Sequence, residues 1–147
     1  MTTRFPAKDI KNQIPANLAA SIISCSDNML LVETSGLPAI ISFLKDSPGL
    51  EFNYLDDITA VDYWDYFELV YQLVSLTRNH KLIIKTRITG RENLKAPSVT
   101  SIYKGASFQE REIHDLMGIE FVGHPDLKPL VLWEGYNGHP LRKDFTG

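Results

Sequence analysis

Three of the four histidines fall near the C-terminal end of the chain beside acidic residues, and imidazole with carboxylate is a ligand set for zinc or iron. They are His114, His124 and His139, near Asp115, Asp126 and Glu134. A helical two-histidine site needs ligands four residues apart, and a structural zinc site usually uses paired cysteines; the sequence has neither pattern. We therefore expect the histidines to donate ring hydrogens to backbone carbonyls or carboxylates in turns. A stand-alone metal-dependent hydrolase that uses the three histidines and Asp115 is the alternative from another class.

Nucleophilic and nucleotide chemistry have less support. Cys25 is the single cysteine, and its apolar surroundings predict a buried, unreactive thiol in a reducing compartment. The chain has no GxSxG motif, and its glycine cluster GYNGHP lacks the lysine and the following helix of a phosphate-binding loop. We expect no catalytic, cofactor-binding or metal-binding residue in this chain.

Length and composition bound the remaining possibilities. A chain of 147 residues is long enough for one hydrophobic core, and 44% hydrophobic and 22% charged residues are typical of a folded protein. The net charge of -3 gives no basic footprint for nucleic acid. We therefore expect no nucleic-acid partner. Nowhere do about 18 apolar residues follow one another, so we also expect no membrane span.

The elements that must position any site are readable from hydrophobic periodicity. Helices are expected at about residues 7–13 and in LPAIISFLKD, where Leu37, Ile40, Ile41 and Leu44 form one stripe. Two short strands are expected on either side of Ser26-Asp27-Asn28, and three long strands from about Phe52 to Thr89. One face of the resulting sheet is apolar and the other largely polar. This favours an α+β fold with two layers, in which helices cover one face of a mainly antiparallel or mixed sheet.

From Arg91 onward the pattern changes. Pro97-Ser98 is expected to open a short helix that runs through Lys104, and Ser107 a second helix in which Glu110 completes a capping box. Gly118 stands where a left-handed C-cap is wanted. The glycines and prolines beyond it predict an extended tail. We therefore divide the chain into an α+β core, residues 1–105, and a helix with its extended C-terminal docking tail, residues 106–147.

The second helix combines an apolar stripe with charge. Ile113, Leu116 and Met117 form the stripe, and Glu110 falls in line with it, so its carboxylate needs a partner. Arg111 with Asp115, and Glu110 with His114, are spaced to pair within the helix. A solvated face with weak ion pairs is one interpretation, since exposed pairs contribute only about 0.3 to 0.5 kcal/mol. The apolar residues of the tail, among them Leu130, Val131, Leu132 and Trp133, favour the other, which is a surface that docks on a partner.

These residues also carry a resemblance. The stretch EREIHDLMGIEFVGHPDLKPLVL resembles the signature of the 30-kilodalton subunit family of respiratory NADH:quinone oxidoreductase (complex I). FNYLDDITAVDY and FELVYQLVSL are similar to that family's paired strands, PSVTSIYKGASFQERE to its approach to the signature, and GHPLRKDF to its closing motif. The similarity covers about residues 37–145.

The resemblance implies a non-redox structural subunit in the peripheral arm of the complex. Flavin and iron–sulfur clusters are then expected in partner subunits, and the chain is expected on the cytoplasmic or matrix side, attached to the membrane only through the complex. Its partners would be the large quinone-site subunit and neighbouring iron–sulfur subunits. The residues that match the motif, and that the resemblance makes docking residues, are Glu110, Arg111, Glu112, Asp115, Gly118, His124, Pro125, Asp126, Leu127, Arg142, Lys143, Asp144 and Phe145.

The sequence departs from the family pattern at several positions. His114 and Met117 stand where aromatic residues are usual, and Ser107-Phe108 stands where Asn-Trp is common. Related subunits occur in membrane-bound [NiFe] hydrogenases, formate hydrogenlyases and coenzyme F420 dehydrogenases. An equivalent subunit of such a complex, with nickel and iron in a partner, is the alternative within the same class.

Overall fold

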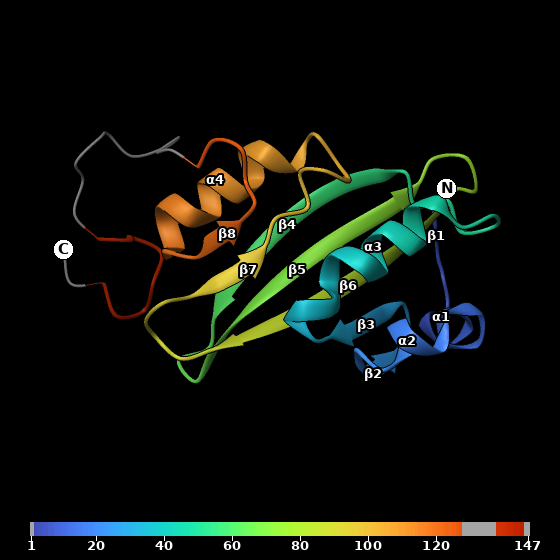
Figure 1. Cartoon of the computed structure of the whole chain (residues 1–147), viewed down its shortest axis with the longest axis horizontal. Helices are drawn as coiled ribbons and strands as arrows, with labels where there is room; N and C mark the ends of the chain where they lie inside the picture. Colours follow the sequence, from blue (N-terminus) through green and yellow to red (C-terminus); the bar gives the residue numbers. More distant parts are fainter. Residues whose placement is uncertain (1, 128–137, 146–147) are drawn as a thin grey trace.

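A computed structural model describes residues 2–127 and 138–145 (Figure 1). It has a six-stranded mixed sheet in the order β2-β3-β6-β5-β4, with β1 beside β6, and a separate pair, β7-β8. The elements are β1 (Thr3–Arg4), α1 (Ala7–Gln13), α2 (Ala16–Ala19), β2 (Ile22–Ser26), β3 (Met29–Val32), the 3-10 helix η1 (Thr34–Gly36), α3 (Leu37–Asp46), β4 (Tyr54–Asp62), β5 (Tyr66–Ser75), β6 (His80–Thr89), β7 (Lys95–Pro97), α4 (Ala106–Met117) and β8 (Glu120–Val122). The predicted α+β class is confirmed.

The three long strands form the centre of the molecule, as predicted. β4 pairs with β5 and β5 with β6, both antiparallel, while β3 joins the free side of β6 in parallel. The two turns that connect the long strands each contain a non-glycine residue with positive φ. These are Trp64 at 70° between β4 and β5, and Asn79 at 56° between β5 and β6. Asparagine tolerates this conformation, whereas tryptophan adopts it only where its surroundings hold it there.

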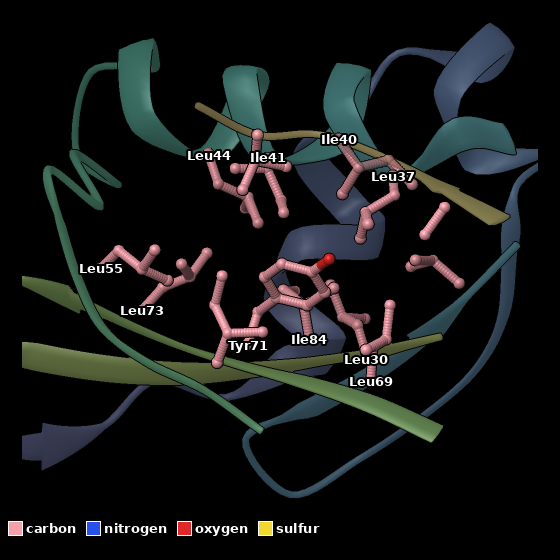
Figure 2. Close-up of a cluster of buried hydrophobic side chains, with 14 of the residues drawn as sticks. Leu30, Leu37, Ile40, Ile41, Leu44, Leu55, Leu69, Tyr71, Leu73 and Ile84 are labelled. Carbon is pink, nitrogen blue, oxygen red and sulfur yellow. The ribbon is translucent and has the colours of Figure 1, made fainter. Parts of the chain in front are cut away.

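The apolar face of the sheet lies under α3. Phe67, Leu69, Tyr71 and Leu73 alternate along β5 and are fully buried, as are the four stripe residues predicted for α3. Figure 2 shows Leu37, Ile40, Ile41 and Leu44 reaching down from α3 toward Leu69, Tyr71 and Leu73. The helical and strand periodicities in the sequence therefore meet in one core.

The predicted helix from Pro97 to Lys104 is wrong. β7 ends at Pro97, and the chain then makes a turn in which Tyr103 N donates to Val99 O at 2.9 Å. The predicted capping box is wrong too, because α4 begins at Ala106 after Gly105 and has no side-chain cap. Ser98 and Glu110, which suggested these two starts, instead bond to each other.

The helix α4 packs against the edge of the sheet. β8 pairs in parallel with β7, and α4 runs along the edge strand β4 (Figure 1). The side-chain oxygen of Gln109 accepts a hydrogen bond from the backbone N–H of Ile58, an edge-strand donor. Among the described residues, no helix is long and apolar enough to cross a membrane.

Candidate docking site

The helix α4 and the segments that follow it bring together the residues expected to dock. α4 buries Ala106, Glu110, Ile113, Asp115 and Met117, so its inner face contains two carboxylates. Of the predicted apolar stripe, Ile113 and Met117 are buried, whereas Leu116 is half-buried. Gly118 ends the helix with φ 81°, as predicted. The chain then enters β8, whose Phe121 is buried in the core.

Glu110 is the most enclosed charged residue of the site, with no exposed surface. Its carboxylate accepts hydrogen bonds from Ser98 Oγ at 2.6 Å and from Val99 N at 2.8 Å. Burial raises the pKa of Glu110, while these two bonds oppose the increase. The sequence correctly predicts that this carboxylate needs a partner, but the partner lies before α4 and is not His114. Glu110 therefore fixes α4 to the turn that precedes it.

The histidines of the site bond to backbone carbonyls, as predicted. His114 Nδ1 donates to Ile119 O at 2.9 Å, His124 Nε2 to Ser107 O at 3.1 Å, and His139 Nδ1 to Asp115 O at 2.9 Å. Within residues 2–127 and 138–145, no group of three or more His, Cys, Asp or Glu side chains could hold a metal ion. Glu134, the remaining candidate ligand, lies outside the described residues, as do Leu130 to Trp133 of the apolar tail.

The closing segment, residues 138–145, is fastened to the core through Asp62. Asp62 accepts two hydrogen bonds from Arg91, Nη1 to Oδ1 at 2.5 Å and Nη2 to Oδ2 at 2.8 Å, and a third from the backbone N–H of Lys143 at 2.8 Å. Arg142 chelates Asp144 with two bonds of 2.9 Å and donates to the backbone oxygen of Arg91 at 2.6 Å. Arg91 also pairs with Asp144 at 2.9 Å. We call this group of five residues the closing network.

The closing network is partly desolvated. The side chain of Asp62 is only 1% exposed and that of Arg91 26%. Hydrogen bonding by Arg91 holds the pKa of Asp62 well below its usual range, and Arg142 lowers the pKa of Asp144. Both guanidinium groups lie over the ring of Phe67, at 4.7 Å for Arg91 and 5.4 Å for Arg142. The charges of Arg142 and Asp144 are thus largely neutralised within the chain, whereas the Lys143 side chain is exposed.

Sequence reasoning missed Asp62, Arg91 and Phe67 as parts of this site. Asp62 ends β4 and Arg91 follows β6, and these strands run in the same direction on either side of β5. The C-terminal ends of β4 and β6 therefore lie at the same end of the sheet. Only the strand order could have revealed this placement, because the residues are far apart in sequence.

The predicted docking residues divide into inward and outward sets. The inward set has side chains or backbone that are buried or closely packed, or side chains that bond within the chain, and consists of Glu110, Asp115, Gly118, His124, Arg142 and Asp144. The outward set consists of Glu112, Pro125, Asp126 and Lys143, which are exposed, and Arg111, Leu127 and Phe145, which are half-buried. Sequence reasoning did not single out three strongly exposed apolar residues here, Phe108 at 62%, Val122 at 53% and Leu141 at 60%.

A groove of about 250 Å³ lies between β4 and α4. Its apolar lining includes Ile58, Ala60, Leu116, Met117 and Leu141, and the carboxylates of Asp57 and Glu112 also line it. The backbone N–H of Leu141 donates to Leu116 O at 3.0 Å, so the closing segment forms one wall. Apolar anchors beside charged groups are the usual composition of a protein–protein contact.

Comparison with known proteins gives a consistent result. Residues 30–147 match the family described as the 30-kDa subunit of respiratory-chain NADH dehydrogenase. The chain is 35% identical over 143 residues to a subunit of the NADH-quinone oxidoreductase of Rhodobacter capsulatus, covering 95% of this chain and 70% of that protein. It is 41% identical over 119 residues to the mitochondrial NADH-ubiquinone oxidoreductase 30.4 kDa subunit of Neurospora crassa, covering 79% of this chain and only 41% of that protein.

A solved structure is similar over nearly the whole chain. It belongs to the membrane-bound sulfane sulfur reductase, described as an archaeal respiratory membrane complex. The TM-score is 0.77 at 28% identity, and the match covers 95% of this chain and 85% of the other.

Proposed function

Because the chain belongs to the 30-kDa subunit family of respiratory-chain NADH dehydrogenase, we propose that it is a non-redox structural subunit of a complex I-type NADH:quinone oxidoreductase. In this role it docks on the large quinone-site subunit and contacts neighbouring iron–sulfur subunits in the peripheral arm. Electron transfer and ion translocation then belong to the assembly, with flavin and iron–sulfur clusters in the partners. The chain lies on the cytoplasmic or matrix side and reaches the membrane only through the complex.

The main support for the proposal is that ionisable groups of the site form hydrogen bonds within their own chain. Glu110 bonds to Ser98 and Val99, the histidines bond to carbonyls, and Asp62 bonds to Arg91. A general acid, base or metal ligand must instead have a lone pair or proton directed at a substrate or an ion. In this site the ionisable groups instead hold α4 and the closing segment in place, which supports a docking role.

The outward set and the three exposed apolar residues beside it supply the docking surface in this proposal. Phe108, Val122 and Leu141 provide apolar contacts, and Glu112 and Lys143 provide charges that select the partner and its orientation. The inward set keeps α4, β8 and the closing segment in the geometry that the partner meets. Arg111 belongs to the surface as well, since its guanidinium lies 5.8 Å from the ring of exposed Phe108.

The test is incorporation of variants into the complex of the host membrane. Glu112→Lys reverses an exposed charge of the docking surface, and Glu33→Lys makes the same change at an exposed position before η1. We expect Glu112→Lys to lower recovery of the chain with the large partner about tenfold, which corresponds to about 1.4 kcal/mol. Glu33→Lys should assemble normally, and both isolated chains should keep the wild-type melting temperature.

Truncation after Gly123 is the more severe variant. It removes the closing segment together with the tail, so the isolated domain is first checked for folding by circular dichroism. A folded, truncated chain that still enters the complex at wild-type stoichiometry would sink the proposal.

A second candidate differs in the parent complex. The similar structure from a sulfane sulfur reductase favours an equivalent subunit in another respiratory membrane assembly, of which membrane-bound [NiFe] hydrogenases, formate hydrogenlyases and F420 dehydrogenases are further cases. The identities to subunits of NADH-quinone oxidoreductases favour the first candidate. The identity of the large subunit that co-purifies distinguishes them.

A further inference from the structure

The sheet has a second face, directed away from α3. Since Leu69, Tyr71 and Leu73 of β5 point into the core, the alternating Val70, Gln72 and Val74 point the other way. The pairings extend this face over the neighbouring strands. They place Thr59 and Lys85 beside Val70, and Ile83 beside Gln72.

An unexpectedly apolar stripe crosses this second face. Its members are Met29, Leu31, Val61, Val70, Val74 and Ile83. All of them lie outside the hydrophobic core cluster and outside the residues packed against that cluster. Leu31 is only 7% exposed although it is not part of that cluster, and Val61 is 37% exposed. We call these residues the second-face stripe.

A row of cations on β6 runs through the second-face stripe, with Ile83 between Lys81 and Lys85. Lys81, Lys85 and Arg87 alternate with the core residues of β6 and therefore share the second face. Glu68 lies between two of them, 3.5 Å from Lys85 Nζ and 3.2 Å from Arg87 Nε. Asp56 of β4 lines the same pocket as Lys81, and Asp57 lies two strands from β6, so the three cations outnumber Glu68 and Asp56 and leave this part of the face positive.

The apolar residues and the excess of cations together favour one kind of partner for the second face. We propose that the second face is covered, in the assembly, by an amphipathic helix of another subunit, whose apolar residues meet the second-face stripe and whose carboxylates face the β6 row. A helix about 10 Å wide spans two strands at roughly 4.8 Å spacing. A second copy of this chain fits poorly, because a two-fold contact would bring its own cationic row close to the first. The inference rests on the proposed role as a subunit of a complex and adds a contact away from the groove between β4 and α4.

The test uses the full chain in its native complex. A photo-reactive p-benzoylphenylalanine replaces Gln72, an exposed residue in the middle of the second face, and in a matched chain it replaces Ile23, which is 56% exposed on the edge strand β2. After irradiation of membranes, the cross-linked peptide is identified by mass spectrometry. We expect position 72 to link to a helical segment that combines apolar residues with Asp or Glu.

A charge reversal then tests whether the cations of β6 attract acidic residues of the partner helix. Lys81→Glu is expected to lower the yield of this cross-link by about two- to fivefold, the effect of one partly exposed ion pair. Lys8→Glu makes the same change at another exposed lysine, on α1, and should leave the yield unchanged.

Three results would overturn the inference: a yield at position 72 no higher than at position 23, a link to a second copy of the chain, or a linked segment without acidic residues. If any of these occurs while Glu112→Lys still lowers incorporation into the complex, the proposed function stands and only the second contact fails. If Glu112→Lys and the truncated chain both assemble normally, the proposed function itself fails.

Discussion

Asp62 shows how a single buried carboxylate can hold a segment that lies far from it in the sequence. Besides Arg91 and Lys143, it accepts the backbone N–H of Trp64 at 2.9 Å, which helps to hold that residue at positive φ. The hairpin between β4 and β5 and the closing segment are thereby tied to the same side chain. Because the pKa of Asp62 is lowered on folding, its stabilising contribution is present above the unfolded-state pKa near 3.9 and is lost as the pH falls through the folded-state value.

Asp62→Asn is expected to destabilise the protein by about 2 kcal/mol. The amide cannot accept both guanidinium bonds as a carboxylate does, and Arg91 is left beside a neutral group. Urea unfolding measures the change, with Arg78→Gln as the control. Arg78 pairs with Glu51 on the exposed surface, so its loss should leave the midpoint almost unchanged. Equal effects of the two variants would contradict the role given to the closing network.

Glu110→Gln is expected to alter the pH dependence of stability. Burial raises the pKa of Glu110, so the folded protein holds this proton more tightly than the unfolded chain. Its contribution is fully present below the unfolded-state pKa near 4.3 and is lost as the pH rises through the folded-state pKa. Glutamine keeps an acceptor for Val99 N and a donor for Ser98 Oγ without the charge. Unfolding from pH 4 to 8 should show the variant gaining stability relative to wild type as the pH rises, and a constant difference would contradict this.

Sequence reasoning identified Glu110 and the histidines as residues needing local partners, since their type and helical position impose that need. It could not name the partners, because Ser98 and Ser107 are fixed by tertiary contacts. Whether the outward residues dock stays a prediction.

At the scale of elements, Gly118 determines how α4 ends. A Cβ at Gly118, where φ is 81°, would lie 2.7 Å from His139 Cδ2. The glycine therefore permits both the left-handed turn and the close approach of the closing segment.

Gly118→Ala is expected to cost about 1 to 2 kcal/mol, combining strain at positive φ with displacement of His139. Gly49→Ala is the matched control, because Gly49 has φ 85° and open space around its Cβ position. Thermal unfolding and hydrogen exchange of residues 138–145 provide the measurement. If Gly118→Ala matches Gly49→Ala and exchange in the closing segment is unchanged, the contact with His139 has no energetic role.

Helices and strands whose apolar residues recur at regular spacing could be predicted from the sequence. The helix α3 and the strands β4, β5 and β6 follow their patterns closely, because each buries one apolar face. The region around Ser98 was predicted as a helix, since local capping signals favoured it, and tertiary bonding to Glu110 overrides them. The parallel pairings of β3 with β6 and of β7 with β8 join segments distant in sequence, which periodicity does not specify.

At the scale of the whole molecule, the core and the C-terminal region have different tasks. The sheet and α3 form the hydrophobic core, and the closing network bonds residues 138–145 to it. The docking surface on α4 and the second face of the sheet are then held in fixed relation to each other. This arrangement is what the proposed role as a structural subunit requires.

The central claim is tested most directly by tagging the chain in its host, solubilising the membranes gently and identifying stoichiometric partners by mass spectrometry. We expect a quinone-site large subunit together with iron–sulfur and ion-translocating membrane subunits. A nickel-binding large subunit in its place would assign the chain to a hydrogenase-type assembly. Recovery of the chain alone would contradict the proposed structural role.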